Sequence, residues 1–300
     1  MELNRNIITG PVRSAASVIL LRDSVPGLQV FLLKRHGLSD VLGGAFVFPG
    51  GKVDPQDGEL DTAAFLDQCP AALHGTLNEP DIDPQTAAAL YVAAIREVFE
   101  ESGILFAYRA ASECAANAAD ASDAAEATML AREGLLFDAV LARLKLRLHT
   151  LSLAPWSRWI TPTMPLVMHK RFDTRFFVAA VPSGQTAVHD GIEATDSTWV
   201  TPRSALMHYR DGLIVLAPPQ IMTLAHLTRY GDVQQVLKAA RSRMPPVICP
   251  EPFEHQGHRV LCYPGDARHS VKERAMPGPT RLWFREKKFE PPEGFESLFA

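Results

Sequence analysis

The feature that most constrains the fold of this chain is a helical stretch, residues 84–102, with an apolar face and an acidic face. Asp83 and Pro84 supply an N-cap and a proline for the first turn, and Gly103 is the residue type that most often ends a helix. The apolar face is formed by Tyr91, Val92, Ile95 and Phe99. Such a face has to be buried, and packing against a β-sheet would bury it.

The opposite face carries three carboxylates, Glu97, Glu100 and Glu101, at positions i, i+3 and i+4. Side chains at this spacing are neighbours on a helix, where like charges cost roughly 0.2–0.5 kcal/mol per pair. Binding of Mg²⁺ or Mn²⁺ would offset this repulsion, because hard cations prefer oxygen ligands. For these three residues taken alone, a solvated acidic face is the simpler alternative.

Apolar segments bounded by turn residues predict strands in the first half of the chain, at 15–21, 28–35 and 45–48. Pro49, Gly50 and Gly51 follow the third segment and predict a sharp, closely packed turn. Further strands are expected at 157–161, 172–181, 197–200, 258–263 and 281–285, and helices after Pro202 and at 219–230 and 233–242. This mixture predicts an α/β (or α+β) fold with a mixed sheet.

Two segments interrupt this order of strands and helices. Residues 58–82 show no clear period and are expected to form an excursion with one short helix. Residues 110–131 are rich in alanine, and 132–148 have the apolar stripe of an amphipathic helix, so a helical insertion is expected, with a flexible linker as the alternative. The chain is therefore interpreted as a single domain, 1–300, with insertions at about 58–85 and 108–155 and a C-terminal extension at about 217–300.

The composition limits the partners and the compartment that we expect. The formal net charge is −4, so the chain lacks the basic excess typical of proteins that bind nucleic acid or an acidic membrane surface. We find no signal-peptide pattern, no apolar run of membrane-spanning length and no peroxisomal address at the C-terminus, which favours a cytoplasmic location. The widely spaced cysteines are interpreted as free thiols: Cys69, Cys114, Cys249 and Cys262.

The residues on the two sides of the first interruption resemble the two ends of the Nudix box. In that family a glycine is followed by five residues, an acid, seven residues and then Arg-Glu-apolar-x-Glu-Glu-x-Gly-apolar. Here the segment Phe48–Asp54 provides the first end, with Gly51 as the opening glycine, and Arg96–Ile104 provides the second end. The second end matches the family pattern at every specified position.

The box is interrupted in this sequence. The acid six positions after Gly51 is Asp57, with Glu59 or Asp61 as alternatives, and 38 residues rather than seven separate Asp57 from Arg96, so that 31 are inserted. The resemblance implies that Arg96 pairs with the acid near Asp57 and braces the loop, with an ordinary surface ion pair as the alternative. Lys52 is placed where it could meet a phosphate or remain solvated.

The resemblance also implies a fold and an activity. Nudix proteins form an αβα sandwich, and Nudix enzymes hydrolyse a nucleoside diphosphate that is linked to another group. Glu97, Glu100 and Glu101, together with the carbonyl of Gly50, would hold one or more divalent ions, Mg²⁺ or Mn²⁺. These ions would bridge the diphosphate and help to generate the attacking water.

Several Nudix families place a further acid on a loop before a late strand, where it serves as a base or a metal ligand. The segment 189–199 occupies that place in this chain. Glu193 is the first candidate for this role and Asp196 the second. Because acids are common in turns, ordinary polar loop residues are the alternative interpretation.

Further features resemble one branch, the interrupted-box coenzyme A diphosphatases of the peroxisomal type and their bacterial relatives. The shared features are the two insertions and the motifs Trp159–Pro162, Arg171–Phe177 and Tyr263–Asp266. This resemblance implies cleavage of coenzyme A or acyl-CoA into 3′,5′-ADP and (acyl-)phosphopantetheine. The alternative substrates are ADP-ribose, NADH and dinucleoside polyphosphates, and the alternative function is nucleotide sensing without catalysis.

Two arginines are candidate ligands for the phosphates of a nucleotide. The segment Phe31–Arg35 lacks the threonine of the coenzyme A motif found in other Nudix enzymes, but Arg35 is still a candidate for the 3′-phosphate. Arg175 is expected to share a strand face with Arg171 and Asp173, where it could bind substrate or be satisfied by Asp173. The expected partner is a small-molecule nucleotide, without nucleic acid or membrane, and a homodimer is left open.

Overall fold

A mixed β-sheet forms the centre of the molecule, and the computed structural model describes residues 7–39, 42–109, 118–165 and 169–300. Within these residues the sheet has eight strands in the order β10-β7-β8-β1-β2-β3, with β4 paired to β1 and β9 paired to β2. Its strands are β1 (Arg13–Ser24), β2 (Gly27–Arg35), β3 (Phe46–Val47), β4 (Gly50–Lys52), β7 (Ala154–Ile160), β8 (Phe172–Ala180), β9 (Ala194–Val200) and β10 (Val247–Ile248). β1 runs parallel to β8 and antiparallel to β2, so the expected mixed sheet is confirmed.

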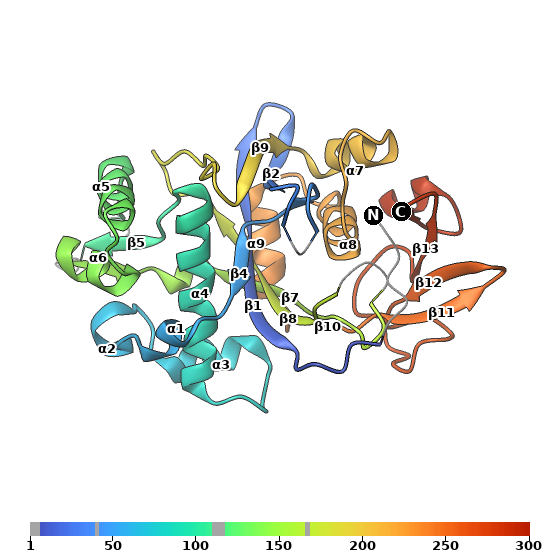
Figure 1. Ribbon diagram of the computed structural model, residues 1–300, viewed down its shortest axis with the longest axis horizontal. Coiled ribbons are helices and arrows are strands. Elements are labelled where there is room, and N and C mark those ends of the chain that lie inside the picture. Colours follow the sequence, from blue (N-terminus) through green and yellow to red (C-terminus); the bar gives the residue numbers. More distant parts are fainter. Residues whose placement is uncertain (1–6, 40–41, 110–117, 166–168) are drawn as a thin grey trace.

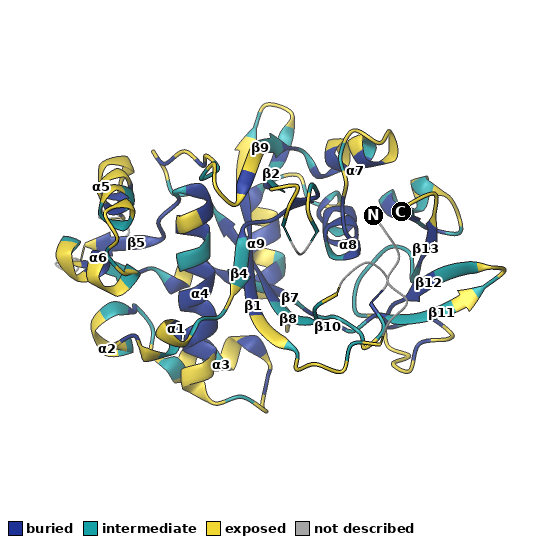
Figure 2. Cartoon of the chain, in the orientation of Figure 1, coloured by how far each residue is buried: buried dark blue, intermediate teal, exposed yellow. Residues whose placement is uncertain are grey.

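The first two strands show how the sequence places two cores, one on each side of the sheet. Strand β1 alternates between the two faces, as the pleat of a strand requires. Its residues Ala16, Val18 and Leu20 are buried in a core on the side of the helix α4 (Pro84–Ser102). Ile19 and Leu21 are buried in a second core on the opposite side. Figure 2 shows the sheet as a buried layer between these elements.

Helix α4 begins and ends at the residues expected from the sequence. The Asp83 side chain accepts a hydrogen bond of 2.8 Å from the backbone N–H of Thr86. Gly103 ends the helix in the left-handed region at φ 71°, which glycine adopts without steric cost. The apolar face packs on the sheet, where the rings of Tyr91 and Phe177 lie 4.7 Å apart between centroids. The acidic face is thereby turned toward β4 and the loop after it.

The second face of the sheet is covered by three helices, α7 (Pro202–Arg210), α8 (Pro218–Leu227) and α9 (Val233–Arg241). Their apolar residues share a core with Ile19, Leu21 and Val30 of the sheet. Figure 1 shows α4 on one side of the central strands and α8 and α9 on the other. The expected αβα sandwich is confirmed.

The expectation of one short helix in the first interruption was wrong, because it contains two complete short helices and the end of a third. They are α1 (Pro55–Glu59), α2 (Thr62–Phe65) and α3 (Pro70–Leu77). Prolines begin two of the helices, and the Asp61 side chain caps the third by accepting from two backbone N–H groups. Helices of only four to eight residues are too short to show a helical period, which is why the sequence pattern did not reveal them.

The second interruption forms a small unit beside α4, with helices α5 (Ala121–Arg132) and α6 (Phe137–Leu144) and the paired strands β5 (Ala107–Arg109) and β6 (Leu146–Leu148). The single helix expected over 132–148 is wrong. Gly134 has φ 92° and Lys145 has φ 54°, so the backbone leaves the helical region at both positions. Residues 110–117, which include Cys114 and the start of the expected helical insertion, lie outside the described residues.

The C-terminal part of the chain adds a separate four-stranded antiparallel sheet that lies beside α8 in Figure 1. Its strands are β11 (Glu251–His255), β12 (His258–Cys262), β13 (Arg281–Arg285) and β14 (Lys288–Glu290). The two strands expected in this region are present as β12 and β13. Tyr209 of α7 attaches the sheet, because its hydroxyl donates to the carbonyl of Phe289 and accepts from the Phe289 N–H.

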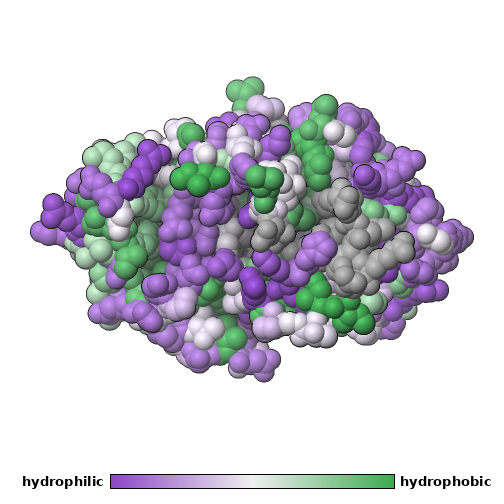
Figure 3. All heavy atoms as spheres, viewed as in Figure 1, coloured by the Kyte–Doolittle hydropathy of each residue, from purple (hydrophilic) through white to green (hydrophobic). Residues whose placement is uncertain are grey.

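The molecular surface is mostly polar on the face shown in Figure 3, where apolar side chains form small separate groups. Among the described residues, none of the helices is long and apolar enough to cross a membrane. Three of the four cysteines belong to the described residues, and Cys69, Cys249 and Cys262 are all free thiols, as expected. The short 3₁₀ helices Thr150–Ser152 and Phe295–Phe299 complete the assigned elements.

Candidate active site

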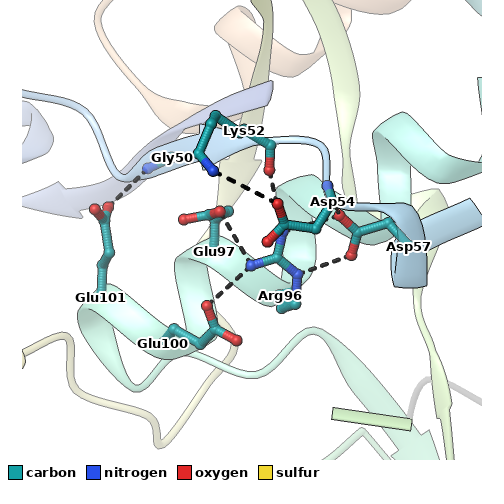
Figure 4. Close-up of polar contacts among 8 residues, drawn as sticks. All are labelled: Gly50, Lys52, Asp54, Asp57, Arg96, Glu97, Glu100 and Glu101. Atoms are coloured by element: carbon teal, nitrogen blue, oxygen red, sulfur yellow. Dashed lines mark hydrogen bonds and ion pairs between the residues drawn. The ribbon is translucent and has the colours of Figure 1, made fainter. Parts of the chain in front are cut away.

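The segment before α1 brings the backbone of Gly50 and Gly51 against the acidic face of α4, and Figure 4 shows Gly50 beside Glu101. The backbone N–H of Gly50 donates to Oε2 of Glu101 at 2.8 Å. A Cβ on Gly50 would lie 2.4 Å from the carbonyl oxygen of Ala16, and a Cβ on Gly51 would lie 2.4 Å from Oε2 of Glu97. At Gly50, where φ is 149° and the clash is with backbone, only glycine fits, whereas a side chain at Gly51 would displace the Glu97 carboxylate. The Pro-Gly-Gly sequence thus allows the loop to approach the carboxylates closely.

Arg96 joins the two ends of the interrupted box. Its guanidinium makes a bidentate ion pair with Asp57, with distances of 2.8 Å from Nε to Oδ1 and 2.9 Å from Nη2 to Oδ2. The same Nη2 donates to the carbonyl of Lys52 at 3.1 Å. Asp57 is buried and accepts a further hydrogen bond of 2.8 Å from the N–H of Asp54. Of the three acids considered from the sequence, Asp57 is thus the partner of Arg96, whereas Asp61 caps α2.

Arg96 also holds two of the three glutamates of α4. Its Nη1 donates to Oε1 of Glu97 and to Oε2 of Glu100, each at 3.0 Å. Glu101 lies apart from this group and is bound by the Gly50 N–H. A single cation therefore serves Asp57, Glu97 and Glu100 together, which leaves net negative charge at this end of the helix.

Burial is the main reason why these glutamates are weaker acids than usual. It raises the pKa of Glu97 to about 7, against the opposing charge of Arg96. It raises the pKa of Glu101 to about 8, although the Gly50 N–H stabilises the charged form. The pKa of Glu100 is raised for the same first reason. Repulsion from Glu193 contributes to the raised pKa of both Glu97 and Glu101, so this loop residue lies within electrostatic reach of the helix.

The chemistry of these groups fits a hard divalent cation. Among the described residues, no three ligating side chains converge on one point, because Glu97 and Glu100 turn toward Arg96 and Glu101 toward Gly50. The available donors are nevertheless carboxylate and carbonyl oxygens, which Mg²⁺ and Mn²⁺ prefer. A divalent ion would supply the positive charge that these buried carboxylates lack. Gly50, Glu97, Glu100 and Glu101 are the residues that could hold it.

Glu97 and Glu100 line one end of a pocket of about 710 Å³ that opens between the sheet, α8 and the C-terminal strands, whereas Glu101 is not part of its lining. Charged residues gather at the α4 end, and the rest of the lining is largely apolar, with Thr161, Lys170 and Thr174 among it. The residues at the charged end include Arg35, Lys52, Glu97, Glu100 and Glu193; those at the apolar end include Phe48, Trp159, Phe176, Pro218, Leu261 and Phe289. A ligand that fills this space meets both environments.

Three residues that the sequence predicted for the site line the pocket: Arg35, Lys52 and Glu193. Arg35 lies at the end of β2, with its Nη2 3.1 Å from the hydroxyl of Ser39. Lys52 is largely exposed, with Nζ 3.7 Å from Asp54. Glu193 lines the pocket, and the loop that carries it is fixed by hydrogen bonds from two backbone N–H groups to Asp190. Asp196, the second candidate for the loop acid, does not line the pocket.

The position of Arg175 does not support a role in substrate binding. Its side chain is 6% exposed, does not line the pocket, and pairs with Glu79 and Asp173. Arg158 stands directly opposite on the neighbouring strand β7 and pairs with the same two acids. Two like charges opposite each other on antiparallel strands are destabilising, so these arginines require buried counter-charges, and substrate is not needed to provide them.

Glu79 was not identified from the sequence. It lies in the first interruption, between α3 and α4, and its carboxylate is almost fully buried against the two arginines. Its 96-residue separation from Arg175 gives no local pattern that could have revealed it. The sequence contains one indirect signal, a pair of arginines on neighbouring strands. A correct alignment of β7 with β8 would have placed these arginines opposite each other and shown that they need an acid.

The match of this chain to a known protein family agrees with the arrangement of the site residues described above. The family described as the NUDT19 Nudix domain matches residues 12–227, more than two thirds of the chain. The chain belongs to this Nudix family. Residues 228–300, which contain the C-terminal sheet, lie beyond the matched part of this NUDT19-like Nudix chain.

Relatives of this Nudix chain come from vertebrates, invertebrates and bacteria. Acyl-coenzyme A diphosphatase NUDT19 of Xenopus laevis is 28% identical over 247 residues, which cover 72% of the chain but only 64% of that protein. Putative nudix hydrolase 7 of Caenorhabditis elegans is 26% identical over 276 residues, covering 91% of the chain and 80% of that protein. The crystal structure of a NUDIX hydrolase from Alicyclobacillus acidocaldarius is similar with a TM-score of 0.60 and 26% identity, over 77% of this chain and 97% of that one.

Proposed function

We propose that this Nudix chain is a divalent-metal-dependent hydrolase that cleaves the diphosphate of coenzyme A or acyl-CoA, releasing 3′,5′-ADP and (acyl-)phosphopantetheine. The observation that carries the proposal is the contact of Gly50 with the buried Glu101 and of Gly51 with Glu97, beside a pocket that both glycines and Glu97 line. A nucleotide-binding module without catalysis has no need of three mutually repelling acids at this place.

The proposed metal ligands are the carboxylates of Glu97, Glu100 and Glu101 and the carbonyl of Gly50. When bound, Mg²⁺ or Mn²⁺ would neutralise the diphosphate and lower the pKa of a coordinated water. Arg96 acts as a positioning residue, because its pairing with Asp57 fixes the loop relative to α4. Glu193 is proposed as the general base, since it lines the pocket, is exposed to it, and carries no ion pair among the described residues.

The phosphates of the substrate are proposed to meet Arg35 and Lys52, the two cations at the charged end whose roles were expected from the sequence. Arg35 would bind the 3′-phosphate, and Lys52 would lie near the diphosphate. Guanidinium groups bind phosphate through two donors in a fixed geometry, which suits Arg35 for a terminal phosphate. The preference for coenzyme A is supported by the similarity to the acyl-coenzyme A diphosphatase of Xenopus laevis and by the size and apolar content of the pocket.

We also propose that residues 1–300 act as one domain in which the C-terminal extension belongs to the catalytic unit. The proposal is supported by the pocket wall, to which Leu261 and Phe289 of the C-terminal sheet contribute together with α4. It is further supported by Tyr209, whose hydroxyl bonds to the backbone of Phe289. The expected substrate is a small molecule, and assembly into a homodimer is a separate question that the pocket does not require.

Product analysis tests the proposed function. The purified chain is incubated with Mg²⁺ or Mn²⁺ and a panel of coenzyme A, acetyl-CoA, ADP-ribose, NADH and a dinucleoside polyphosphate, and the products are identified by liquid chromatography and mass spectrometry. We expect 3′,5′-ADP and phosphopantetheine to be released from coenzyme A. Faster cleavage of ADP-ribose than of coenzyme A would reject the substrate, and no cleavage of any compound would reject the activity.

A further inference from the structure

The face of the sheet that lines the pocket carries two exposed cations on neighbouring strands. Arg13 is the first residue of β1 and Lys52 is the last residue of β4, and both line the pocket. Lys52 is opposite Ala15 in the antiparallel pairing of these strands, so Arg13 is its diagonal neighbour on the same face. Diagonal neighbours lie roughly 7–8 Å apart, within the reach of two long side chains. The two positive charges can therefore contact one ligand.

The protein supplies little negative charge to this pair. The guanidinium of Arg13 is exposed and makes no ion pair or hydrogen bond with any of the described residues. Lys52 reaches only Asp54, at 3.7 Å, and Asp54 is also 3.8 Å from Arg96. Arg96, by contrast, is held by three further acids. Arg13 and Lys52 together thus share less than one full counter-charge from the described part of the chain.

A second pair of neighbouring cations in the same sheet is neutralised in a different way. Arg158 and Arg175 are opposite each other on β7 and β8, and each pairs with Glu79 and Asp173. These arginines are largely buried, so their counter-charges have to come from the protein. Arg13 is open to the pocket instead, where a bound anion can supply the negative charge.

The residues beside the two cations suit a phosphate group. Ala15 is directly opposite Lys52 on one side and Thr174 of β8 on the other, and its small side chain forms the floor of the pocket between them. Thr174 lines the pocket and is half-buried, and its hydroxyl has no hydrogen-bond partner among the described residues. Lys170, in the segment before β8, adds a further positive charge to the lining. A hydroxyl donor next to cations can bind the oxygens of one phosphate together with them.

We infer that Arg13, Lys52 and Thr174 form a subsite on the sheet that binds one phosphate of the substrate's diphosphate. The inference rests on the proposed function, in which the carbonyl of Gly50 is a metal ligand. Gly50 and Lys52 are two residues apart on β4, or about 7 Å along the strand. A diphosphate with one phosphate at the metal can therefore extend its other phosphate toward Lys52 and Arg13. Arg13 and Thr174 are thus substrate-binding residues that no motif of the sequence indicated.

The test compares the binding of ADP with that of AMP, which lacks the second phosphate of a diphosphate. Calorimetry in excess EDTA, which prevents turnover, gives Kd for the wild type and for the variants Arg13→Met and Thr174→Val, and Tm confirms that each variant is folded. We expect ADP binding to weaken about tenfold to a hundredfold in Arg13→Met, the loss typical of a hydrogen bond to a charged group. Thr174→Val, which keeps the shape of the side chain, should weaken it about three- to tenfold. Binding of AMP should stay within about twofold of the wild type in both variants, less than the effect of one net hydrogen bond.

The matched control is Arg22→Met on the same strand. Arg22 does not line the pocket; its guanidinium lies 4.3 Å from the centre of the Trp199 ring and donates to Gln29, so its loss should leave both affinities unchanged.

Three results would overturn the inference. They are a wild type that binds ADP no more tightly than AMP, an unchanged affinity of Arg13→Met for ADP, and a loss in Arg13→Met that is confined to 3′,5′-ADP, which would assign Arg13 to the 3′-phosphate. Because the readout is binding without metal, these outcomes are separate from the product analysis. Failure to cleave coenzyme A, with ADP binding that depends on Arg13, would reject the proposed substrate and keep the phosphate subsite.

Discussion

Arg96 and Asp57 lie 39 positions apart, and their bidentate ion pair closes the interrupted box into one continuous site. The pair is almost entirely removed from solvent, since the two side chains are 11% and 2% exposed. Helices α2 and α3 lie between the partners in the chain, yet the loop and α4 remain in contact. The interruption therefore extends the fold at the side of the site without separating the residues that form it.

Removal of divalent metal should abolish hydrolysis, and the metal-free protein should become less stable as the pH rises. The folded-state pKa values of Glu97 and Glu101 are about 7 and about 8, both above the ordinary value of 4.5. The folded protein thus keeps protons that the unfolded chain loses, and this stabilisation is complete below pH 4.5 and is lost as the pH rises through both folded values.

Thermal unfolding in EDTA across this pH range measures the effect. Added Mn²⁺ should raise Tm most at high pH, where it no longer competes with protons for the carboxylates. The Glu101→Gln variant is the control and should show a weaker dependence of Tm on pH. A Tm in EDTA that rises between pH 5 and pH 8, or turnover that persists in excess chelator, would contradict the metal site.

Replacing Glu100 or Glu101 by glutamine should lower kcat by orders of magnitude while the protein stays folded. Each change removes one negative charge from the proposed metal site and keeps the size of the side chain. Above pH 8, where Glu101 of the metal-free protein is ionised, the free energy of unfolding should rise for Glu101→Gln, because a buried charge is removed. Steady-state kinetics and urea unfolding give the two quantities, and near-normal rates in both variants would show that this helix face is only solvated.

Glu193→Gln should reduce kcat much more than it changes KM. A general base acts in the chemical step, so its loss affects turnover rather than substrate binding. Asp196→Asn is the matched control on the same loop and should have little effect, because Asp196 does not line the pocket. A large loss for Asp196→Asn with none for Glu193→Gln would reverse the assignment.

Arg35→Ala should remove most of the preference for coenzyme A over its 3′-dephospho form. One charge-assisted contact is worth about 1.5–3 kcal/mol, so the wild type should favour coenzyme A by at least about tenfold in kcat/KM. Lys52→Ala is the control, since it should impair both substrates equally. Equal rates of the wild type on the two forms would exclude a 3′-phosphate site at Arg35.

Arg175→Met should destabilise the fold without changing this preference. The substitution leaves Glu79 and Asp173 with one fewer counter-charge, and breaking a buried pair costs about 3–5 kcal/mol. Glu79→Gln should cost a similar amount, and the double variant less than the sum of the two. Urea unfolding measures these values, with Arg210→Met, which breaks an exposed pair with Asp211, as a control below about 1 kcal/mol. A selective loss of coenzyme A cleavage in Arg175→Met would restore Arg175 to the substrate site.

The sequence predicts best where the signals are local. The ends of α4 follow from a cap, a proline and a glycine, and the sheet strands follow from apolar segments bounded by turn residues. The partnership of Arg96 with an acid near Asp57 could be predicted from the family resemblance, but the choice of Asp57 needed the fold. Glu79 could not be predicted, because its importance depends on buried contacts with segments that are distant in the chain.

The position of the C-terminal sheet links ligand affinity to local opening of the chain. Leu261 and Phe289 contribute to the pocket from strands at the periphery of the molecule. Whenever these strands separate from α8, the apolar end of the pocket becomes open to water, and a ligand that needs this wall can bind only to the closed form. Such a ligand would therefore slow hydrogen exchange of the backbone amides in β12 and β14, far from the carboxylates of α4, whereas 3′,5′-ADP would leave their exchange unchanged.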